Sequence, residues 1–196
     1  MVTSYGFFIP FSVFLAPLLT LSACFSTHLP ALDHHASIQR LRQLASTELA
    51  LSVNSEAVDG VAGFQFLTVL PVTRVYTPNF NEDLSAQLSL DAGLRGYRTV
   101  SPESAGVSTN HLSVTVQELT VSGYCYFIMR QPHAQITLRG ELRAPDGHLI
   151  SSCETVASSS FTARFAFSTE LSEVLRISIT DASAQLFTCL GIKTAR

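Results

Sequence analysis

The stretch AQITLRGELRAPDG, residues 134–147, carries the clearest structural pattern in this sequence. Such an alternation of apolar and polar residues is typical of a strand with one face in the core and the other in water. Pro145-Asp146-Gly147 then signals a tight turn, so we expect residues 148–156 to return as the next antiparallel strand. The apolar set is Ala134, Ile136, Leu138 and Leu142, and the polar set is Gln135, Thr137, Arg139, Glu141 and Arg143.

Further extended segments precede this hairpin. Residues 49–53 and 112–117 alternate in the same way, and residues 97–100 suit a short strand. A longer segment, residues 64–75, is rich in β-branched and aromatic side chains, and Pro71 within it implies a sheet edge or a bulge. The pattern predicts a sheet that is mostly an antiparallel meander.

Two amphipathic helices complete the predicted fold. The first follows Pro78, with Asn79 or Asn81 as its cap and Gly96 as its left-handed stop. The second spans residues 169–189. We therefore expect an α+β domain, a mostly antiparallel sheet with both helices packed on one face. The second helix carries its apolar stripe at steps of three and four, on Leu171, Val174, Leu175, Ile179, Ala182 and Leu186.

The N-terminus carries a pattern typical of a secreted lipoprotein. Residues 5–23 contain no charged side chain and end on two small residues directly before a cysteine. We predict a lipobox, in which Leu21, Ser22 and Ala23 are recognised by the signal peptidase and Cys24 is lipidated. The alternative is an uncleaved membrane anchor whose cysteine falls there by chance.

Lipidation would divide the chain into three parts: a signal peptide, residues 1–23; a lipidated N-terminus and tether, residues 24–46; and a single periplasmic domain, residues 47–192. A diacylglycerol group and an acyl chain on Cys24 would hold the protein on a membrane, since each buried CH₂ contributes about 0.8 kcal/mol. We expect no other cofactor. By resemblance to other lipoproteins, Phe25 and Ser26 carry no retention signal such as aspartate, which favours the outer membrane, facing the periplasm.

Composition and motifs argue against several classes of function. The 12 basic and 15 acidic residues give a net charge of −3, and the basic ones form no stripe, so we expect no nucleic-acid partner. The chain holds no nucleophile elbow, no CxxC, no HExxH and no phosphate-binding glycine loop, so we expect a non-enzymatic protein with no catalytic residues. His34 and His35 have only Asp33 nearby as a further ligand, and we interpret them as a solvated pair and not as a metal site.

The order of these elements resembles the YajG-like bacterial lipoproteins, a family of small envelope proteins with a helix-on-sheet domain. The residues that carry the resemblance are the lipobox, a helix ending in Leu94-Arg95-Gly96-Tyr97, the strand of residues 112–119, a hairpin, and the C-terminal amphipathic helix. More loosely, the chain resembles other helix-on-sheet envelope lipoproteins. The resemblance implies an envelope location and assigns no catalytic residue.

Three cysteines remain once Cys24 is lipidated, an odd number for an oxidising compartment. If residues 131–132 form a two-residue loop, the strand after it separates Cys125 from Cys153 by about 9–10 Å, too far for a bridge. Cys189 lies on the apolar stripe of the last helix. We predict that any disulfide is Cys125–Cys189, and three buried reduced thiols remain the alternative.

A cluster of aromatic residues is the candidate contact patch. Tyr124, Tyr126 and Phe127 follow a glycine, and such residues are enriched where proteins touch. The alternative for each of them is packing in the core or across a hairpin.

Two functions fit these observations. The first is a non-enzymatic, membrane-anchored lipoprotein that acts as an accessory or scaffold of an envelope assembly, transport or secretion system through contacts with another envelope protein. The second is a periplasmic binder of a lipid, a glycan or peptidoglycan. A deep apolar pocket would favour the second function, and a filled core with an exposed sheet edge or aromatic patch would favour the first.

Overall fold

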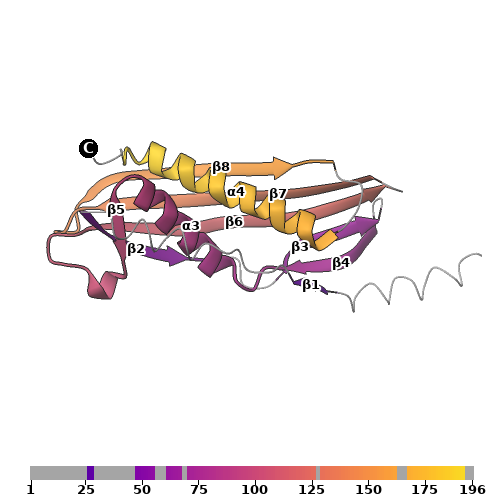
Figure 1. Cartoon of the computed structure of the whole chain (residues 1–196), viewed down its shortest axis with the longest axis horizontal. Helices are drawn as coiled ribbons and strands as arrows, with labels where there is room; N and C mark the ends of the chain where they lie inside the picture. The colour runs from indigo at the N-terminus through magenta and orange to yellow at the C-terminus, as the bar shows by residue number, and fades with distance from the viewer. Residues whose placement is uncertain are drawn as a thin grey trace, which may run out of the picture.

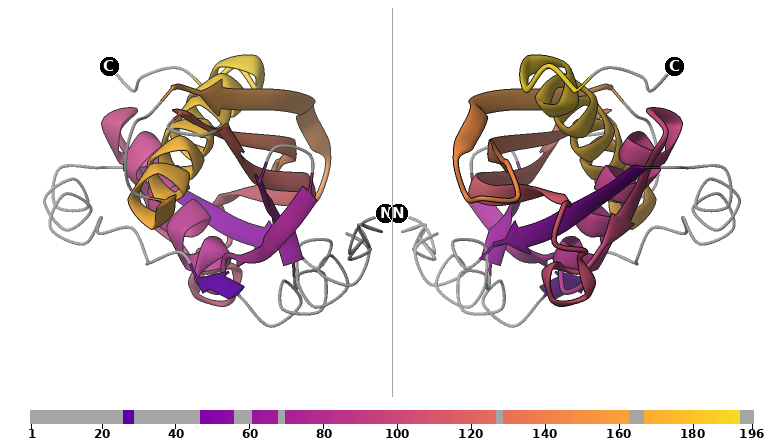
Figure 2. Two further views of the ribbon diagram at one scale, coloured as in Figure 1. Left: turned by 90° about the vertical axis from the view of Figure 1, so that its right-hand side faces the viewer. Right: turned by 90° about the vertical axis from the view of Figure 1, so that its left-hand side faces the viewer.

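Two layers make up the part of the chain that the structure describes: a curled sheet and two helices packed against one of its faces (Figure 1). The structure is a computed structural model that describes residues 26–28, 47–55, 61–67, 70–126, 129–162 and 167–192. Viewed from its two ends, the sheet curls round the core and the helices close the open side (Figure 2). The α+β class and the two helices on one face are as predicted.

The sheet is built around its longest strand, β6. On one edge of β6 lies β7, followed by β8; the other edge is shared by β2, beside the first half of β6, and β3, beside its last residues. From there the sheet continues to β5 on one side and to β4 and β1 on the other. The strands are β1 (Ser26–His28), β2 (Thr47–Asn54), β3 (Val61–Leu67), β4 (Leu70–Tyr76), β5 (Tyr97–Val100), β6 (Asn110–Tyr126), β7 (Met129–Arg143) and β8 (Leu149–Ser160).

The sheet is mixed, which corrects the prediction of an antiparallel meander throughout. The β6–β7–β8 meander and the β3–β4 hairpin are antiparallel, whereas β2 pairs in parallel with β5 and β6, β3 with β6, and β1 with β4. Parallel neighbours need a crossover between them. The helix between β4 and β5 supplies one, and it returns the chain to the edge of β2.

Three local predictions also need correction. The hairpin between β6 and β7 turns after Tyr126, so residues 131–132 lie inside β7. Pro132 lies near the start of β7, one residue before the described pairing of β7 with β8 begins at His133. Residues 64–75 form most of the β3–β4 hairpin and not one extended segment, while residues 26–28 of the predicted tether form β1. Pro71 was predicted to mark a sheet edge or a bulge, and the register shift beside it shows the bulge.

Both helices end where glycine permits it. Helix α3 (Phe80–Leu94) is followed by Gly96 at φ 87°, and α4 (Phe167–Cys189) by Gly191 at φ 73°, a backbone conformation that favours glycine. Asn79 occupies the N-cap position of α3 but makes no side-chain capping hydrogen bond. A short 3₁₀ helix, η3 (Pro102–Ser104), follows β5.

The core lies between α4 and the long strands. The six apolar residues predicted for the α4 stripe are buried, as are the four predicted apolar positions of β7, whereas Cys189, which was placed on the same stripe, is exposed. Gly140 lets the end of α4 approach the sheet, since a Cβ there would lie 2.9 Å from Cδ1 of Leu186. Ser178, on the same face of α4, is fully buried and donates a hydrogen bond to the carbonyl of Ala134 at 3.1 Å.

Arg95, at the C-cap of α3, links this helix to the C-terminal end of α4. Its guanidinium donates hydrogen bonds to the carbonyls of Ile192 and Ala184, at 3.2 and 3.5 Å, and lies 5.1 Å from the ring centre of Phe187. A cation is favourable beside the carbonyls that end a helix. This contact gives the Leu-Arg-Gly-Tyr stretch a structural role.

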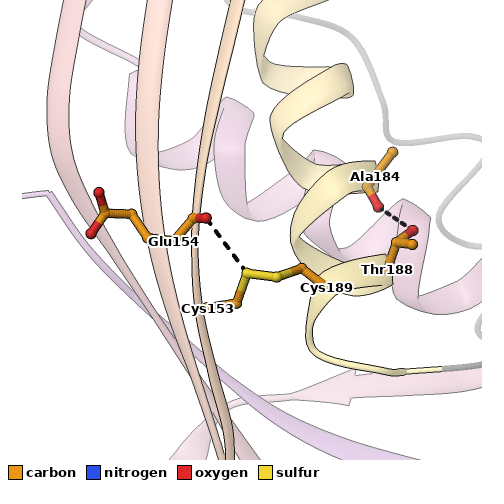
Figure 3. Close-up of a disulfide and its surroundings, with 5 residues drawn as sticks. All are labelled: Cys153, Glu154, Ala184, Thr188 and Cys189. Carbon is orange, nitrogen blue, oxygen red and sulfur yellow. Dashed lines mark hydrogen bonds between the residues drawn. A yellow bond between two sulfur atoms is a disulfide. The ribbon is translucent and has the colours of Figure 1, made fainter.

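A disulfide joins Cys153 of β8 to Cys189 at the end of α4 (Figure 3). The predicted Cys125–Cys189 pairing is therefore wrong. Because the β6–β7 turn falls earlier than residues 131–132, Cys125 lies opposite Arg130 near the tip of the hairpin. Cys153 instead lies opposite Gly140, where α4 comes close to the sheet.

Candidate functional site

The candidate site is a hollow near the hairpin end of β6, β7 and β8, which we call the Tyr124 hollow. Its volume is about 410 Å³. It lies on the face of the sheet opposite the helices, because Tyr124 alternates with the buried positions Val121 and Gly123 that face α4. The lining residues are Tyr124, Gln131, Pro132, His133, Ser160, Phe161 and Thr162.

Strand register brings these residues together from three places in the chain. Tyr124 of β6 lies opposite Gln131 of β7, and His133 of β7 lies opposite Ser160, the last residue of β8. Directly opposed side chains on one face are close enough to interact. Phe161 then continues beyond the strand at the rim, with 37% of its surface exposed.

The chemistry of the hollow suits a neutral polar partner. Its lining combines two aromatic rings, one of them a phenol, with an amide, an imidazole and two hydroxyls, and none of the lining residues that the structure describes carries a carboxylate, an ammonium or a guanidinium. Aromatic rings provide contact area, and the polar groups both donate and accept hydrogen bonds. The arrangement is therefore one for binding a peptide backbone or a hydroxylated ligand.

The predicted contact patch is only partly described. Tyr124 lies in the hollow and is half-buried. Tyr126 is the last residue of β6, but the structure does not describe its side chain. Phe127 lies outside the described residues. Sequence reasoning missed Gln131, His133 and Ser160, because only the β6–β7–β8 register places them beside Tyr124.

A second hollow of about 410 Å³ lies between α3, β2, β5 and η3. Its hydroxyl groups already bond to one another: Thr99 donates to Ser89 at 3.0 Å, and the hydroxyls of Ser101 and Ser104 lie 2.9 Å apart. No histidine or carboxylate is among its lining residues, which offer no base to activate a serine. The lining residues are Leu51, Ser85, Ser89, Thr99, Val100, Ser101 and Ser104.

The other end of the same sheet face is charged. Glu141 accepts hydrogen bonds from Arg143 at 2.8 Å and from Arg139 at 3.1 Å, all on β7. The hydrogen bond from Arg143 is the main cause that lowers the pKa of the Glu141 carboxyl. Glu48 of β2 and Arg98 of β5 form a further ion pair across a parallel strand pair. The face thus divides into a charged end and the uncharged Tyr124 hollow.

A similar ion pair on α4 gives an expected response to acid. Arg176 donates two hydrogen bonds to Glu173, at 2.9 and 2.6 Å, and these lower the pKa of the Glu173 carboxyl. A carboxyl whose pKa is lower in the folded state than in the unfolded state stabilises the fold at a pH above its unfolded-state pKa, about 4.3. This stabilisation is lost as the pH falls through the folded-state pKa. We expect the melting temperature to fall less in Glu173→Gln than in the wild type between about pH 6 and about pH 3.

The expected difference is below about 1 kcal/mol, because both side chains are nearly half exposed. Calorimetry at several pH values measures the difference. The control is Ser158→Ala, a substitution of an exposed residue that lies away from the hydrogen-bonded carboxyls. Equal pH slopes for the wild type and Glu173→Gln would show that the pair does not contribute.

Other sequence predictions fall outside these sites. Leu21, Ser22, Ala23 and Cys24 lie outside the described residues. So does the pair of histidines of the predicted tether, and among the described residues no group of His, Cys, Asp and Glu is arranged to hold a metal ion.

Among the helices that the structure describes, none combines the length and the apolar character needed to cross a membrane.

Comparison with known proteins finds likeness only among solved structures. No protein-family model matches the sequence, and no curated protein matches it. The minor lipoprotein from Acinetobacter baumannii is 16% identical, with a TM-score of 0.46, over 72% of this chain and 90% of that one. A protein from Xanthomonas campestris of the family DUF330 is 11% identical, with a TM-score of 0.47, over 84% and 93%.

The PelC dodecamer from Paraburkholderia phytofirmans is also similar, at 13% identity and a TM-score of 0.44, over 87% of this chain and 95% of that one. The solved structures with a similar arrangement thus include bacterial lipoproteins. At these identities and TM-scores they assign neither a family nor a function to this chain.

Proposed function

We propose that the chain is a membrane-anchored envelope lipoprotein without enzymatic activity, an accessory or scaffold that contacts another envelope protein. The lipobox at Leu21–Cys24 supports the anchor, with acyl groups on Cys24 and the outer membrane as the destination. The Cys153–Cys189 disulfide supports an oxidising compartment such as the periplasm, since structural disulfides are rare in the cytosol. Membership of the YajG-like family remains a prediction from the sequence pattern.

The single observation that carries the binding role is the Tyr124 hollow. The core between sheet and helices is filled by apolar side chains, whereas this hollow is lined by aromatic and uncharged polar groups on the opposite face. Aromatic residues with hydrogen-bonding groups are enriched at the centre of protein contacts. The hollow therefore supports recognition of a partner and offers no paired acid and base for chemistry.

Photo-crosslinking in cells tests this role. A photoreactive phenylalanine analogue at Phe161, at the rim, is expected to trap one envelope protein, and Tyr124→Ala in the same chain is expected to reduce that product at least about tenfold. A loss of 1.4 kcal/mol or more in binding, ordinary for an interface aromatic, gives this factor. The melting temperature of Tyr124→Ala should stay near that of the wild type, because Tyr124 is half-buried.

The control is Ser104→Ala, which alters the second hollow and should leave the crosslink unchanged. Loss of folding in Tyr124→Ala would assign Tyr124 to the core. An unchanged crosslink in a folded Tyr124→Ala protein would contradict a binding role for the hollow.

The lining of the hollow also favours a second candidate, a binder of glycan or peptidoglycan. Sugar rings stack on aromatic side chains, and their hydroxyls would meet Gln131, His133 and Ser160. A lipid is less favoured, because the polar groups of the hollow would be left without partners. Soluble peptidoglycan fragments titrated into the wild type and Tyr124→Ala, followed by calorimetry, separate the candidates: heat of binding lost in the variant supports the glycan.

A further inference from the structure

One long edge of the sheet is open within the described part of the chain. Strand β8 pairs there only with β7, and it has 12 residues, whereas the other two edge strands, β5 and β1, have 4 and 3. Proteins usually protect such an edge with proline, lysine, a bulge or a covering element. The sequence of β8, LISSCETVASSS, contains no proline and no basic residue; its ladder with β7 has one bulge, at Ile150, and is regular from Ser151 to Ser160.

Two of the exposed apolar side chains of β8 lie symmetrically about Cys153. Ile150 and Val156 lie three residues before and after it, and both are about half exposed, at 49% and 53%. Between them on the same face lie Ser152 and Glu154, the one charged residue of the strand. Such a pattern is complementary to itself when two copies of the strand pair in antiparallel orientation.

We propose that β8 pairs with β8 of a second copy of this chain, antiparallel and centred on Cys153, to form a two-fold dimer with one continuous sheet. In this register Ile150 lies opposite Val156 of the second copy, twice in the dimer, and Ser152 lies opposite Glu154. Apolar pairs directly opposed across strands are stabilising, and the serine hydroxyl donates to the carboxylate.

Charge selects this register among its neighbours. A shift of one residue in the centre, to Glu154, would place two Glu154 carboxylates directly opposite each other, which is destabilising. A centre at Thr155 would put Glu154 opposite Val156, and a centre at Ser152 would put it opposite Ile150, each time setting a carboxylate against an apolar side chain. Of the four centres compared, Cys153 is the one that sets Ile150 opposite Val156 and Glu154 opposite a serine.

The two-fold axis would run perpendicular to the sheet, since the two edges join side by side. Both α4 helices would then lie on one face of the dimer, and both Tyr124 hollows on the other. The proposal therefore goes beyond the proposed function, because it presents two binding hollows on the same side of one assembly.

Disulfide trapping between two tagged chains tests the register. One full-length chain carries Ile150→Cys and the other Val156→Cys, and mild oxidation in cells should link them into a product containing both tags. Either variant expressed alone should give no linked product. In a dimer of one variant, the introduced thiols of the two copies are offset by six residues along the paired strands, about 20 Å, which is too far for a disulfide. Links formed equally by single and mixed variants, or none in the mixture, would overturn the register.

Sedimentation of the purified full chain in detergent tests the dimer itself. We expect the mass of two copies for the wild type and of one copy for Ile150→Lys/Val156→Lys, whose four new cations would face one another across the edge. The matched control is Ser158→Lys, which is exposed on the same face of β8 but lies opposite no residue of the second β8. Circular dichroism confirms that the variants are folded.

A monomeric wild type, an assembly larger than a dimer, or a dimer that survives the double lysine substitution would each contradict the proposal. None of these outcomes tests the proposed function, because the crosslink at Phe161 concerns the Tyr124 hollow and does not involve the β8 edge.

Discussion

Replacing Cys153 and Cys189 together by serine is expected to lower the free energy of unfolding by about 3–4 kcal/mol. The two residues are 36 positions apart in sequence, and closing a loop of this length removes that much conformational entropy from the unfolded chain. For a domain of this size the melting temperature should fall by about 10 °C. Both side chains are at least partly exposed, so the lost packing adds little.

The matched control is Cys125→Ser, which removes a cysteine outside the disulfide and should leave the melting temperature under oxidising conditions unchanged. Reductant should destabilise the wild type and Cys125→Ser to the same extent, and should not affect the double variant. A non-reducing peptide map that links Cys125 to Cys189, or a large destabilisation by Cys125→Ser alone, would contradict the observed pairing.

Gly63→Ala is expected to destabilise the protein by about 3 kcal/mol, a large effect for the addition of one methyl group. A Cβ at Gly63 would lie 1.8 Å from the carbonyl oxygen of Val121, so the backbone of β3 or β6 would have to move. The glycine lies where the β3–β4 register shifts, and β3 also pairs with β6 nearby. Chemical denaturation of the wild type and the variant measures the difference in free energy of unfolding.

Gly123→Ala is the matched control on the facing strand. Its Cβ would meet Leu171 at 3.5 Å, an ordinary contact, and we expect a change within about 0.5 kcal/mol. If both alanine variants were equally stable, the close approach of β3 to β6 at Gly63 would be wrong.

The elements that the sequence predicts well are those whose signal is local. The α4 stripe, the alternation of β7 and the glycine that follows the first helix each depend on neighbouring residues, and each appears in the structure. Helix α3, predicted only as amphipathic, buries Leu84 and Leu88 but leaves Leu94 60% exposed, because the helix ends there beside the turn at Gly96.

Register and pairing were harder to predict, because they depend on contacts between distant residues. The bulge at Gln117 shifts β6 by one residue against β7, and no local pattern marks it. The turn after Tyr126 has no glycine or proline signal, whereas Gln131-Pro132 has one and is not a turn. These two features together explain the wrong cysteine pairing. They also explain why Tyr124 was found from sequence while its neighbour His133 was not.

The intact mass of the protein shows whether this chain is, as we propose, a membrane-anchored lipoprotein of the envelope. Protein extracted from native membranes should begin at Cys24 and carry added acyl mass, and it should gain two hydrogens on reduction of the Cys153–Cys189 disulfide. In Cys24→Ala the acyl mass should be absent. A full-length chain without acyl mass would contradict the lipoprotein account and the envelope location with it.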